Sequence, residues 1–219
     1  SADAVVIGGG ASGLMCAGTA GERGRKVIVL EPNRDLGRKL RITGKGRCNV
    51  TNNCDIKTIM TNIPGDGRFL YSALSAFPPE RVMEHFEALG VPLKTERGSR
   101  VFPQSDNAND VAGALSRWCS HSGVEVIREK ALKIIVREGA VVGVETRDGV
   151  IDCESAVICT GGLSYPLTGS TGDGARMAAA LGHTVMKCRP SLVPLESKDS
   201  CCGEMQGFAL KNVTLSAFE

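Results

Sequence analysis

The first thirty residues alternate short apolar runs with a segment of small residues. Residues 3–8 (DAVVIG) and 26–31 (KVIVLE) have the length of buried strands, and residues 12–24 between them are rich in Ala and Gly. This order predicts a strand–helix–strand unit of about 30 residues with parallel strands and a right-handed crossover.

Helical spacing recurs in the middle of the chain. A helix is predicted over residues 79–89, where one face carries Val82, Met83, Phe86 and Leu89. Two further helices are predicted over 110–122 and 172–181, each with a glycine directly after it. Residues 93–102, interrupted by a polar Arg-Gly-Ser, predict a hairpin.

Short apolar segments separated by Gly-containing turns follow the helix predicted over 110–122. They predict strands over 124–127, 131–136, 141–146 and 150–152. We interpret 124–153 as an antiparallel meander, after which the apolar run 155–159 returns to the parallel sheet. The predicted fold class is α/β, a doubly wound (Rossmann-like) domain with an antiparallel β-meander insertion.

Two regions show neither the hydrophobic period of a helix nor that of a strand. Residues 37–64 predict a long loop, and loops of this length in compact domains are usually functional or disordered. After residue 190 the pattern loosens, and 192–195 and 213–218 look like strands of a new element. We therefore expect a nucleotide-binding domain over 1–190 and the truncated start of an inserted substrate-side β domain over 191–219.

Composition narrows the function classes. The net charge is +2 over 219 residues, so no overall field favours a nucleic acid or a membrane. No apolar run approaches the ~20 residues of a membrane span, and the first residues lack the pattern of a signal peptide. Nine cysteines without CxxC or metal-ligand spacing indicate a reducing cytoplasm and no metal site.

The sequence GGGASG lies between the first predicted strand and helix. Gly8 permits the tight turn, Gly10 lets the backbone approach a pyrophosphate, and Gly13 lets the helix pack close to the strand. The helix N-terminus favours the phosphates. Glu31 ends the second strand, where its carboxylate can accept hydrogen bonds from ribose hydroxyls and would repel a 2′-phosphate. The motif predicts FAD or NAD rather than NADP.

A second glycine cluster favours FAD over NAD. Thr160, Gly161 and Gly162 follow the strand that leaves the meander, and a GSTGDG run opens the last helix. A plain NAD-binding domain needs no meander between its sheet strands. The alternative is that Gly161, Gly162 and the GSTGDG run form an ordinary strand-to-helix loop that contacts no cofactor.

At this point the motifs carry a resemblance. GGGASG with Glu31, GRKLRITGKGRCNVTN, CTGGLSYPLTGSTGDG and LGH together resemble the BaiN/RdsA-type FAD/NAD(P)-dependent oxidoreductases, the YhiN-like, aminoacetone-oxidase-like flavoproteins. The resemblance covers essentially the whole chain. Members of that family are about twice as long, so this chain looks like the N-terminal half.

The resemblance implies FAD as the cofactor and NAD(P)H as the probable reductant. It places Ala11 and Ser12 beside the glycines at the pyrophosphate, and Ala131 on the strand that meets the adenine. The cofactor-binding residues expected from motif and resemblance together are Gly8, Gly10, Ala11, Ser12, Gly13, Glu31, Pro32, Arg38, Lys39, Leu40, Gly44, Gly46, Arg47, Cys48, Asn49, Ala131, Thr160, Gly161, Gly162, Gly172 and Asp173.

The basic stretch 37–54 is open to three interpretations. As a cofactor loop, its glycines lie against the flavin, and Lys45 or Arg47 near the pyrimidine edge raises the flavin potential. As a redox site, Cys48 and Cys54 form a disulfide, although their spacing is one residue too long for the glutathione-reductase pattern. Lys45, Arg47 and Cys48 are the weak catalytic candidates.

The third interpretation is a surface for RNA phosphates. It would consist of Arg34, Arg38, Lys39, Arg41, Lys45, Arg47 and Arg68, with no interleaved aromatic residue. The resemblance adds weight, because part of the family is linked to uridine reduction in ribosomal RNA. RNA is therefore a possible partner and substrate.

The remaining candidates are isolated. Tyr165 lies beside the second glycine cluster and is a weak candidate proton donor; His85 is expected to be a packed or surface histidine. The sequence thus predicts an FAD-dependent oxidoreductase that passes electrons from NAD(P)H to an unidentified acceptor. The alternatives are flavin-dependent uridine reduction (dihydrouridine synthesis) in ribosomal RNA and an incomplete nucleotide-binding fragment.

Overall fold

The computed structural model describes residues 1–189, 197–208, 213, 214 and 216. Contacts divide the chain into two units, Ser1–Val185 and Met186–Glu219. In the second unit the structure describes one short helix, α8 (Cys201–Glu204). The strand expected at 192–195 lies outside the described residues, as does half of 213–218, so the substrate-side domain stays a prediction.

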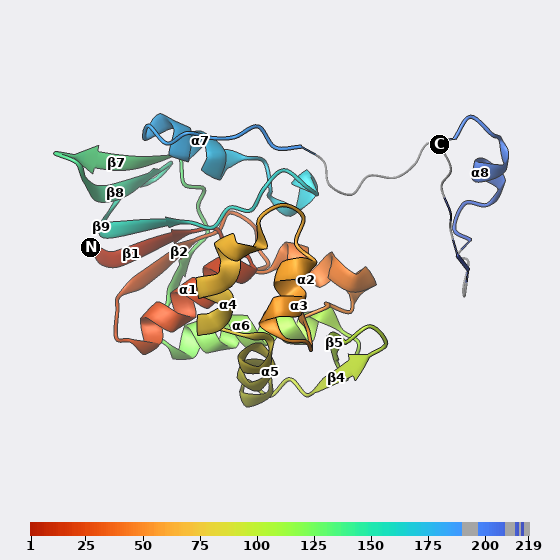
Figure 1. Ribbon diagram of the computed structural model, residues 1–219. Helices are drawn as coiled ribbons and strands as arrows, with labels where there is room; N and C mark the ends of the chain where they lie inside the picture. The colour runs from red at the N-terminus through yellow and green to blue at the C-terminus, as the bar shows by residue number, and fades with distance from the viewer. Residues whose placement is uncertain (190–196, 209–212, 215, 217–219) are drawn as a thin grey trace. The chain divides into compact units, whose positions relative to one another are not determined.

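A six-stranded sheet forms the centre of the first unit, in the order β6-β2-β1-β9-β8-β7 (Figure 1). The parallel part consists of β1 (Ala2–Ile7), β2 (Val27–Leu30), β6 (Glu125–Ile127) and the end of β9 (Gly149–Ile158). The strands β8 (Ala140–Thr146) and β7 (Lys133–Arg137) extend the sheet in antiparallel pairing. This sheet confirms the predicted Rossmann-like fold class.

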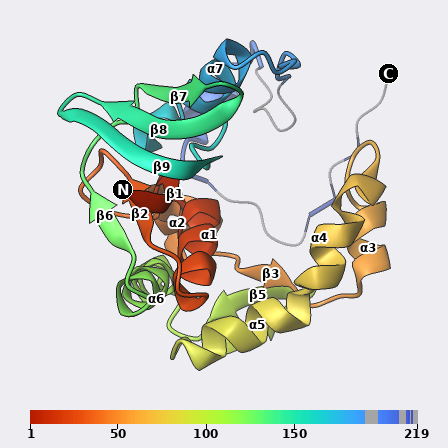
Figure 2. The ribbon, with the colours of Figure 1, turned by 90° about the vertical axis from the view of Figure 1, so that its left-hand side faces the viewer.

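The parallel strands bury side chains on both faces. Figure 2 shows α1 (Ala11–Glu22) and α6 (Ala108–His121) on one side of the sheet and α7 (Asp173–Ala180) on the other. One core lies between the sheet and the helices α1 and α6, and it contains Val6, Val27, Val29, Leu14 and Leu115. The alternate strand residues Val5, Ile7, Ile28 and Leu30 join Met177 in the second core. This alternation explains why the strands read as continuous apolar runs.

The structure corrects two details of the predicted meander. The segment 124–127 was expected to belong to it, but β6 pairs in parallel with β2 at the edge of the main sheet. The segments 150–152 and 155–159 were expected to be separate strands. They form the single strand β9, which pairs with β8 through its first half and with β1 through its second.

The prediction of a long loop over 37–64 was wrong. This region contains α2 (Arg38–Ile42), the 3₁₀ turn η1 (Thr43–Gly46), β3 (Thr51–Asn52) and α3 (Ile56–Thr61). Asp55 caps α3, because its side chain accepts a hydrogen bond from the Thr58 N–H. Each element is too short to show a hydrophobic period, which is why the pattern missed it.

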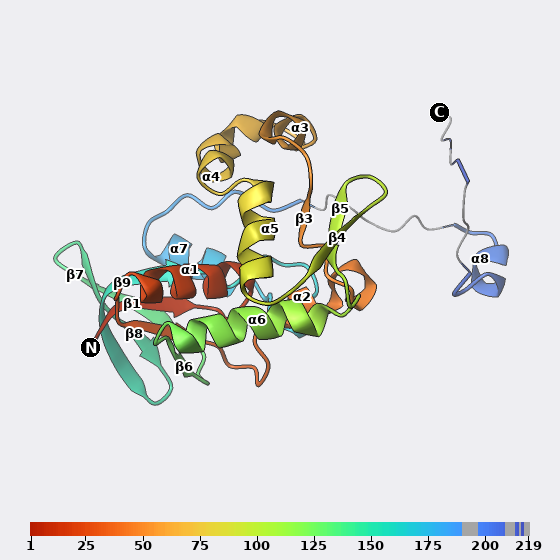
Figure 3. The ribbon, with the colours of Figure 1, turned by 90° about the horizontal axis from the view of Figure 1, so that it is seen from below.

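The connection from α3 continues through η2 (Gly67–Leu70) and α4 (Tyr71–Ala76) to α5 (Pro79–Ala88). A small antiparallel sheet, β3-β5-β4, follows it, with β4 (Leu93–Glu96) and β5 (Arg100–Pro103) forming the predicted hairpin. Figure 3 shows that α5 and this hairpin lie close to α6, while α3 and α4 extend away from it.

His85 on α5 is packed, as expected, rather than placed at the nucleotide motif. Its ring lies edge-on to Phe77, Phe86 and Trp118, and burial lowers its pKa. Among the helices that the structure describes, none combines the length and the apolar character needed to cross a membrane.

Candidate functional site: an anion-binding pocket at the strand ends

A pocket of about 390 Å³ lies where β1, β2 and β9 end and α1 begins. The structure brings thirteen of the predicted cofactor-binding residues to its lining: Gly8, Gly10, Ala11, Ser12, Glu31, Pro32, Arg38, Lys39, Leu40, Ala131, Thr160, Gly161 and Asp173. Ligands of open α/β sheets bind at this edge. The contact of each residue with a cofactor stays a prediction.

Three glycines of the first motif have different geometries. A Cβ on Gly8, whose φ is +109°, would lie 2.5 Å from the Cys159 carbonyl oxygen. A Cβ on Gly13 would lie 1.9 Å from the Gly8 carbonyl oxygen, so Gly13 packs the helix onto the turn and does not itself line the pocket. At Gly10 a Cβ would meet nothing within 4 Å, and this residue faces the pocket.

The N-terminus of α1 opens onto the same space. Gly10 is the N-cap and supplies no side-chain acceptor, and the first turn holds no acidic residue. Because the first N–H groups of a helix have no partner within the helix, they are available to an anion from the pocket.

Glu31 directly follows β2, and its carboxylate holds the glycine turn after β1 through a hydrogen bond. Its Oε2 accepts a hydrogen bond from the Gly9 N–H at 2.9 Å. Its Oε1 accepts from the backbone N–H of Asn33 at 2.9 Å and from the Asn33 side-chain amide at 2.6 Å. The carboxylate therefore shapes the glycine turn and lines the pocket at the same time.

Two cations in the pocket have no carboxylate partner among the described residues. Arg38 donates to the Asn33 side-chain oxygen, and Lys39 donates to Ser164 O and Ser170 Oγ, each at 2.7 Å. Ion pairs of the described residues include neither. Two uncompensated cations beside a helix N-terminus suit a diphosphate, which carries two negative charges.

Asp173, the first residue of α7, is held differently. Its carboxylate pairs with Lys130 at 3.0 Å and with Arg176, and it accepts a hydrogen bond from Thr171 Oγ1 at 2.8 Å. Burial raises the pKa of Asp173, but the hydrogen bonds from Thr171 and Lys130 and the charges of Lys130 and Arg176 together outweigh burial, so the net pKa lies below its usual range. The group is a carboxylate at neutral pH.

The whole GKGRCN segment, residues 44–49, lies outside the pocket lining, to which the preceding residue Thr43 contributes. Gly44, Gly46, Arg47, Cys48 and Asn49 do not line it, and neither do Gly162 and Gly172 of the second cluster. In the orientation that satisfies its hydrogen bonds, the Asn49 amide nitrogen donates to Val101 O and Thr51 O. Asn49 therefore bridges β3 and β5.

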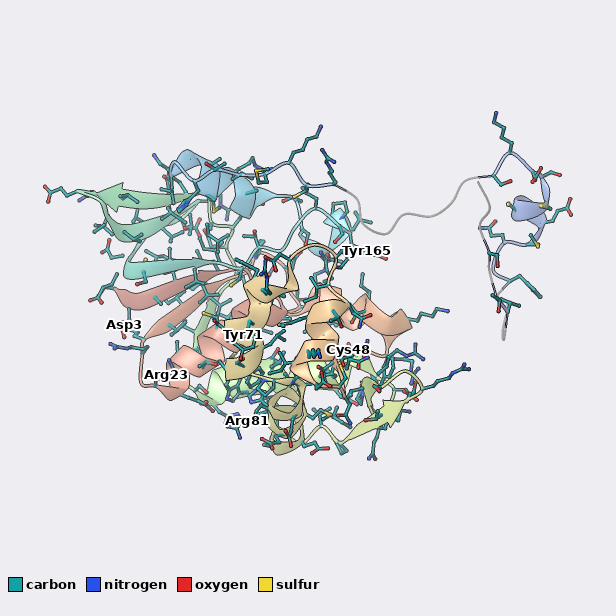
Figure 4. The ribbon with its side chains drawn as sticks, in the orientation of Figure 1. Asp3, Arg23, Cys48, Tyr71, Arg81 and Tyr165 are labelled. Carbon is teal, nitrogen blue, oxygen red and sulfur yellow. The ribbon has the colours of Figure 1, made fainter. Side chains whose placement is uncertain are left out.

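Cys48 and Cys54, which the redox interpretation would join in a disulfide, are free thiols. Cys48 is 1% exposed, and burial raises its pKa (Figure 4). A buried thiol with a raised pKa is a poor nucleophile, so the geometry argues against a redox role for Cys48.

Arg47 stacks over the Phe102 ring at 4.1 Å and pairs with two carboxylates. Its Nε donates to Asp106 at 2.8 Å, its Nη2 also reaches Glu96, and Lys94 pairs with Asp106 at 2.7 Å. The guanidinium thus fastens the segment after η1 to the small sheet. This geometry favours a structural role for Arg47 over the predicted contact with a flavin edge.

Arg47→Ala should lower the Tm at neutral pH, because it leaves two carboxylates with Lys94 alone. The Arg47 hydrogen bond lowers the pKa of Glu96, and hydrogen bonds from Lys94 and Arg47 lower that of Asp106. Their stabilisation is present above their usual pKa of about 4 and is lost as the pH falls further. The Tm difference from wild type should therefore shrink between pH 7 and about pH 3.

The matched control is Arg81→Ala, which removes an exposed pair with Glu84 and should change the Tm little. An unchanged Tm for Arg47→Ala, together with a lowered potential of a bound flavin, would instead support the contact predicted from the sequence.

Several lining residues were missed by the sequence analysis, namely Asn33, Lys130, Thr168, Gly169 and Ser170. Lys130 precedes the predicted Ala131, and Ser170 lies within the GSTGDG run, so proximity to the motifs was the available signal. Tyr165 is 67% exposed on the loop between β9 and α7 (Figure 4), and it does not line the pocket.

Two curated proteins are similar to this chain over most of its length. The chain is 28% identical over 208 residues to the ribosomal RNA dihydrouridine synthase of Escherichia coli K12, covering 94% of this chain and 51% of that protein. It is 31% identical over 198 residues to the 3-dehydro-bile acid delta(4,6)-reductase of Clostridium scindens, covering 88% and 47%. The chain thus spans about half the length of the curated relatives it matches.

Among solved structures, the 3-ketosteroid-delta4-(5alpha)-dehydrogenase of Rhodococcus jostii RHA1 aligns with a TM-score of 0.55 at 16% identity, covering 83% of this chain and 54% of that chain. This likeness shows a shared fold. A family model described as the HI0933-like protein Rossmann domain matches residues 2–217. The chain therefore belongs to the HI0933-like Rossmann domain family.

Proposed function

We propose that this chain is the FAD-binding part of an oxidoreductase that takes electrons from NAD(P)H and reduces a carbon–carbon double bond conjugated to a carbonyl group. The observation that carries the cofactor assignment is the pocket itself. Open space at Gly10, the N-terminus of α1 and the uncompensated cations of Arg38 and Lys39 meet at one place. These groups fit the diphosphate of FAD.

The acceptor class follows from what the two curated relatives have in common. Dihydrouridine forms when the ring double bond of uridine, which is conjugated to a carbonyl, is saturated. A 3-dehydro steroid with double bonds at positions 4 and 6 presents the same conjugation. When bound, FAD supplies hydride transfer, and conjugation makes the far carbon of the double bond electron-poor enough to accept hydride.

Within this class, uridine in ribosomal RNA is a specific candidate acceptor. Two relatives named as rRNA dihydrouridine synthases favour it. The predicted basic surface is divided in the structure, since Arg47 and Arg68 pair with acidic residues and Arg41 donates to Asn109. RNA binding therefore rests on the relatives more than on this surface. A reducing cytoplasm is part of the proposal, in keeping with nine free thiols.

The test is the visible absorption spectrum of the purified chain, taken before and after anaerobic addition of NADPH or NADH. We expect a flavin spectrum that bleaches, and that returns when a 3-oxo-Δ4 steroid or a uridine-containing RNA is added. A flavin that does not bleach would favour the nucleotide-binding fragment. A chain that takes up no FAD would contradict the proposal.

A further inference from the structure

The loop between β9 and α7 contributes residues to the pocket lining. Leu163, Tyr165 and Leu167 are 59%, 67% and 88% exposed, so its large apolar residues do not anchor it. Its regular structure is a single 3₁₀ turn, η3 (Pro166–Thr168). Tyr165 has a φ of 53°, in the left-handed region that a side chain disfavours.

Lys39 connects this loop to the rest of the fold. Its Nζ donates to Ser164 O and to Ser170 Oγ, each at 2.7 Å, across sequence separations of 125 and 131 residues. Ser170 is 5% exposed. Among the described residues, every hydrogen bond that joins 161–170 to protein outside 159–173 comes from Lys39.

The same ammonium group lines the pocket. An ammonium has three donors, and two of them are directed at the loop. The third contact, with Ser164 Oγ, is long at 3.4 Å. The donor that makes this long contact can turn to an anion in the pocket, because a hydrogen bond to phosphate is stronger than one to a neutral hydroxyl.

We propose that Lys39 is a positioning residue that couples cofactor binding to the order of the loop 161–170. This inference rests on the proposed function, since the anion in the pocket is the diphosphate of FAD. With the phosphate fixing the ammonium, the two remaining donors hold Ser164 and Ser170. Without it, the long lysine side chain retains more rotamer freedom and the loop opens more often.

Hydrogen–deuterium exchange of the peptide covering 161–170 tests this inference, with and without saturating FAD. In the wild-type chain we expect FAD to slow exchange there by about tenfold or more. Lys39→Met should bind FAD more weakly and, at saturation, should show no protection of the loop. Ser170→Ala keeps the ammonium but breaks the buried contact, so at saturating FAD it should lose most of the protection.

Lys57→Met is the matched control, because Lys57 is an exposed residue of α3 outside the pocket lining. It should behave as wild type. Full FAD-dependent protection in Lys39→Met would overturn the inference while leaving the proposed function standing. A wild-type chain that retains no FAD would contradict the proposed function itself. In that case the FAD-free exchange rate of the loop still decides whether Lys39 holds it, and equal rates in wild type and Lys39→Met would show that it does not.

Discussion

Gly13→Ala should strongly destabilise the unit Ser1–Val185, whereas Gly10→Ala should leave the fold intact and weaken FAD binding. A Cβ at Gly13 would lie 1.9 Å from a backbone oxygen of Gly8, and neither α1 nor the end of β1 can move away without breaking the core behind them. We expect a loss of more than about 3 kcal/mol of unfolding free energy, at the upper end of overpacking effects.

Gly10 offers the matched comparison within the same motif. Its φ of −84° and ψ of −170° suit alanine, and a Cβ there meets no protein atom within 4 Å. The change at the helix N-cap should therefore alter stability by about 1 kcal/mol or less. The added methyl group projects into the space proposed for the diphosphate, so FAD affinity should fall by at least about tenfold, equivalent to 1.4 kcal/mol.

Thermal unfolding and flavin titration separate the two effects. A folded Gly13→Ala protein with a wild-type Tm would show that the helix start is not packed as described. A Gly10→Ala protein with unchanged FAD affinity would show that the diphosphate does not approach this residue, and the assignment of the pocket would then lose its main support.

The parallel core could be predicted from the sequence, because strands that are buried on both faces are apolar at successive positions. Val5, Ile7, Val27 and Val29 are apolar regardless of which face they occupy, and a glycine motif directly follows the first of these strands. Resemblance to the flavoprotein family was confirmed by the family match. Each of these features depends on residues that are close together in the chain, so a single sequence is enough to detect it.

The elements between 37 and 61 were missed because long-range contacts hold them. Arg41 of α2 donates to Leu36 O and to Asn109 of α6, which lies 68 positions along the chain. The GKGRCN segment was assigned to the cofactor because of the family resemblance and because it is basic and glycine-rich. That composition does not reveal that Glu96 and Asp106 fold back to neutralise Arg47. Lys130 of the pocket was missed for a similar reason, since Asp173 meets it only in the folded chain.

Glu31→Gln should reduce both stability and FAD affinity, although the side chain keeps its size. The carboxylate accepts three hydrogen bonds, from the Gly9 N–H on one oxygen and from two Asn33 nitrogens on the other. A glutamine offers only one oxygen, so its NH₂ group must face a donor at one of these positions. One N–H then loses its partner, at a cost of about 1–3 kcal/mol.

The affinity effect has the same origin. The Gly9 N–H fixes the turn that sets Gly10 and the start of α1, so a loosened turn misplaces the groups proposed for the diphosphate, and FAD affinity should fall by about tenfold or more. Glu154→Gln, an exposed carboxylate on β9 outside the pocket lining, is the control and should leave both quantities unchanged. Wild-type affinity in Glu31→Gln would mean that the turn is held by its glycines and by α1 alone. The acid at the end of β2 would then be needed neither for the shape of the site nor for a contact with the ribose.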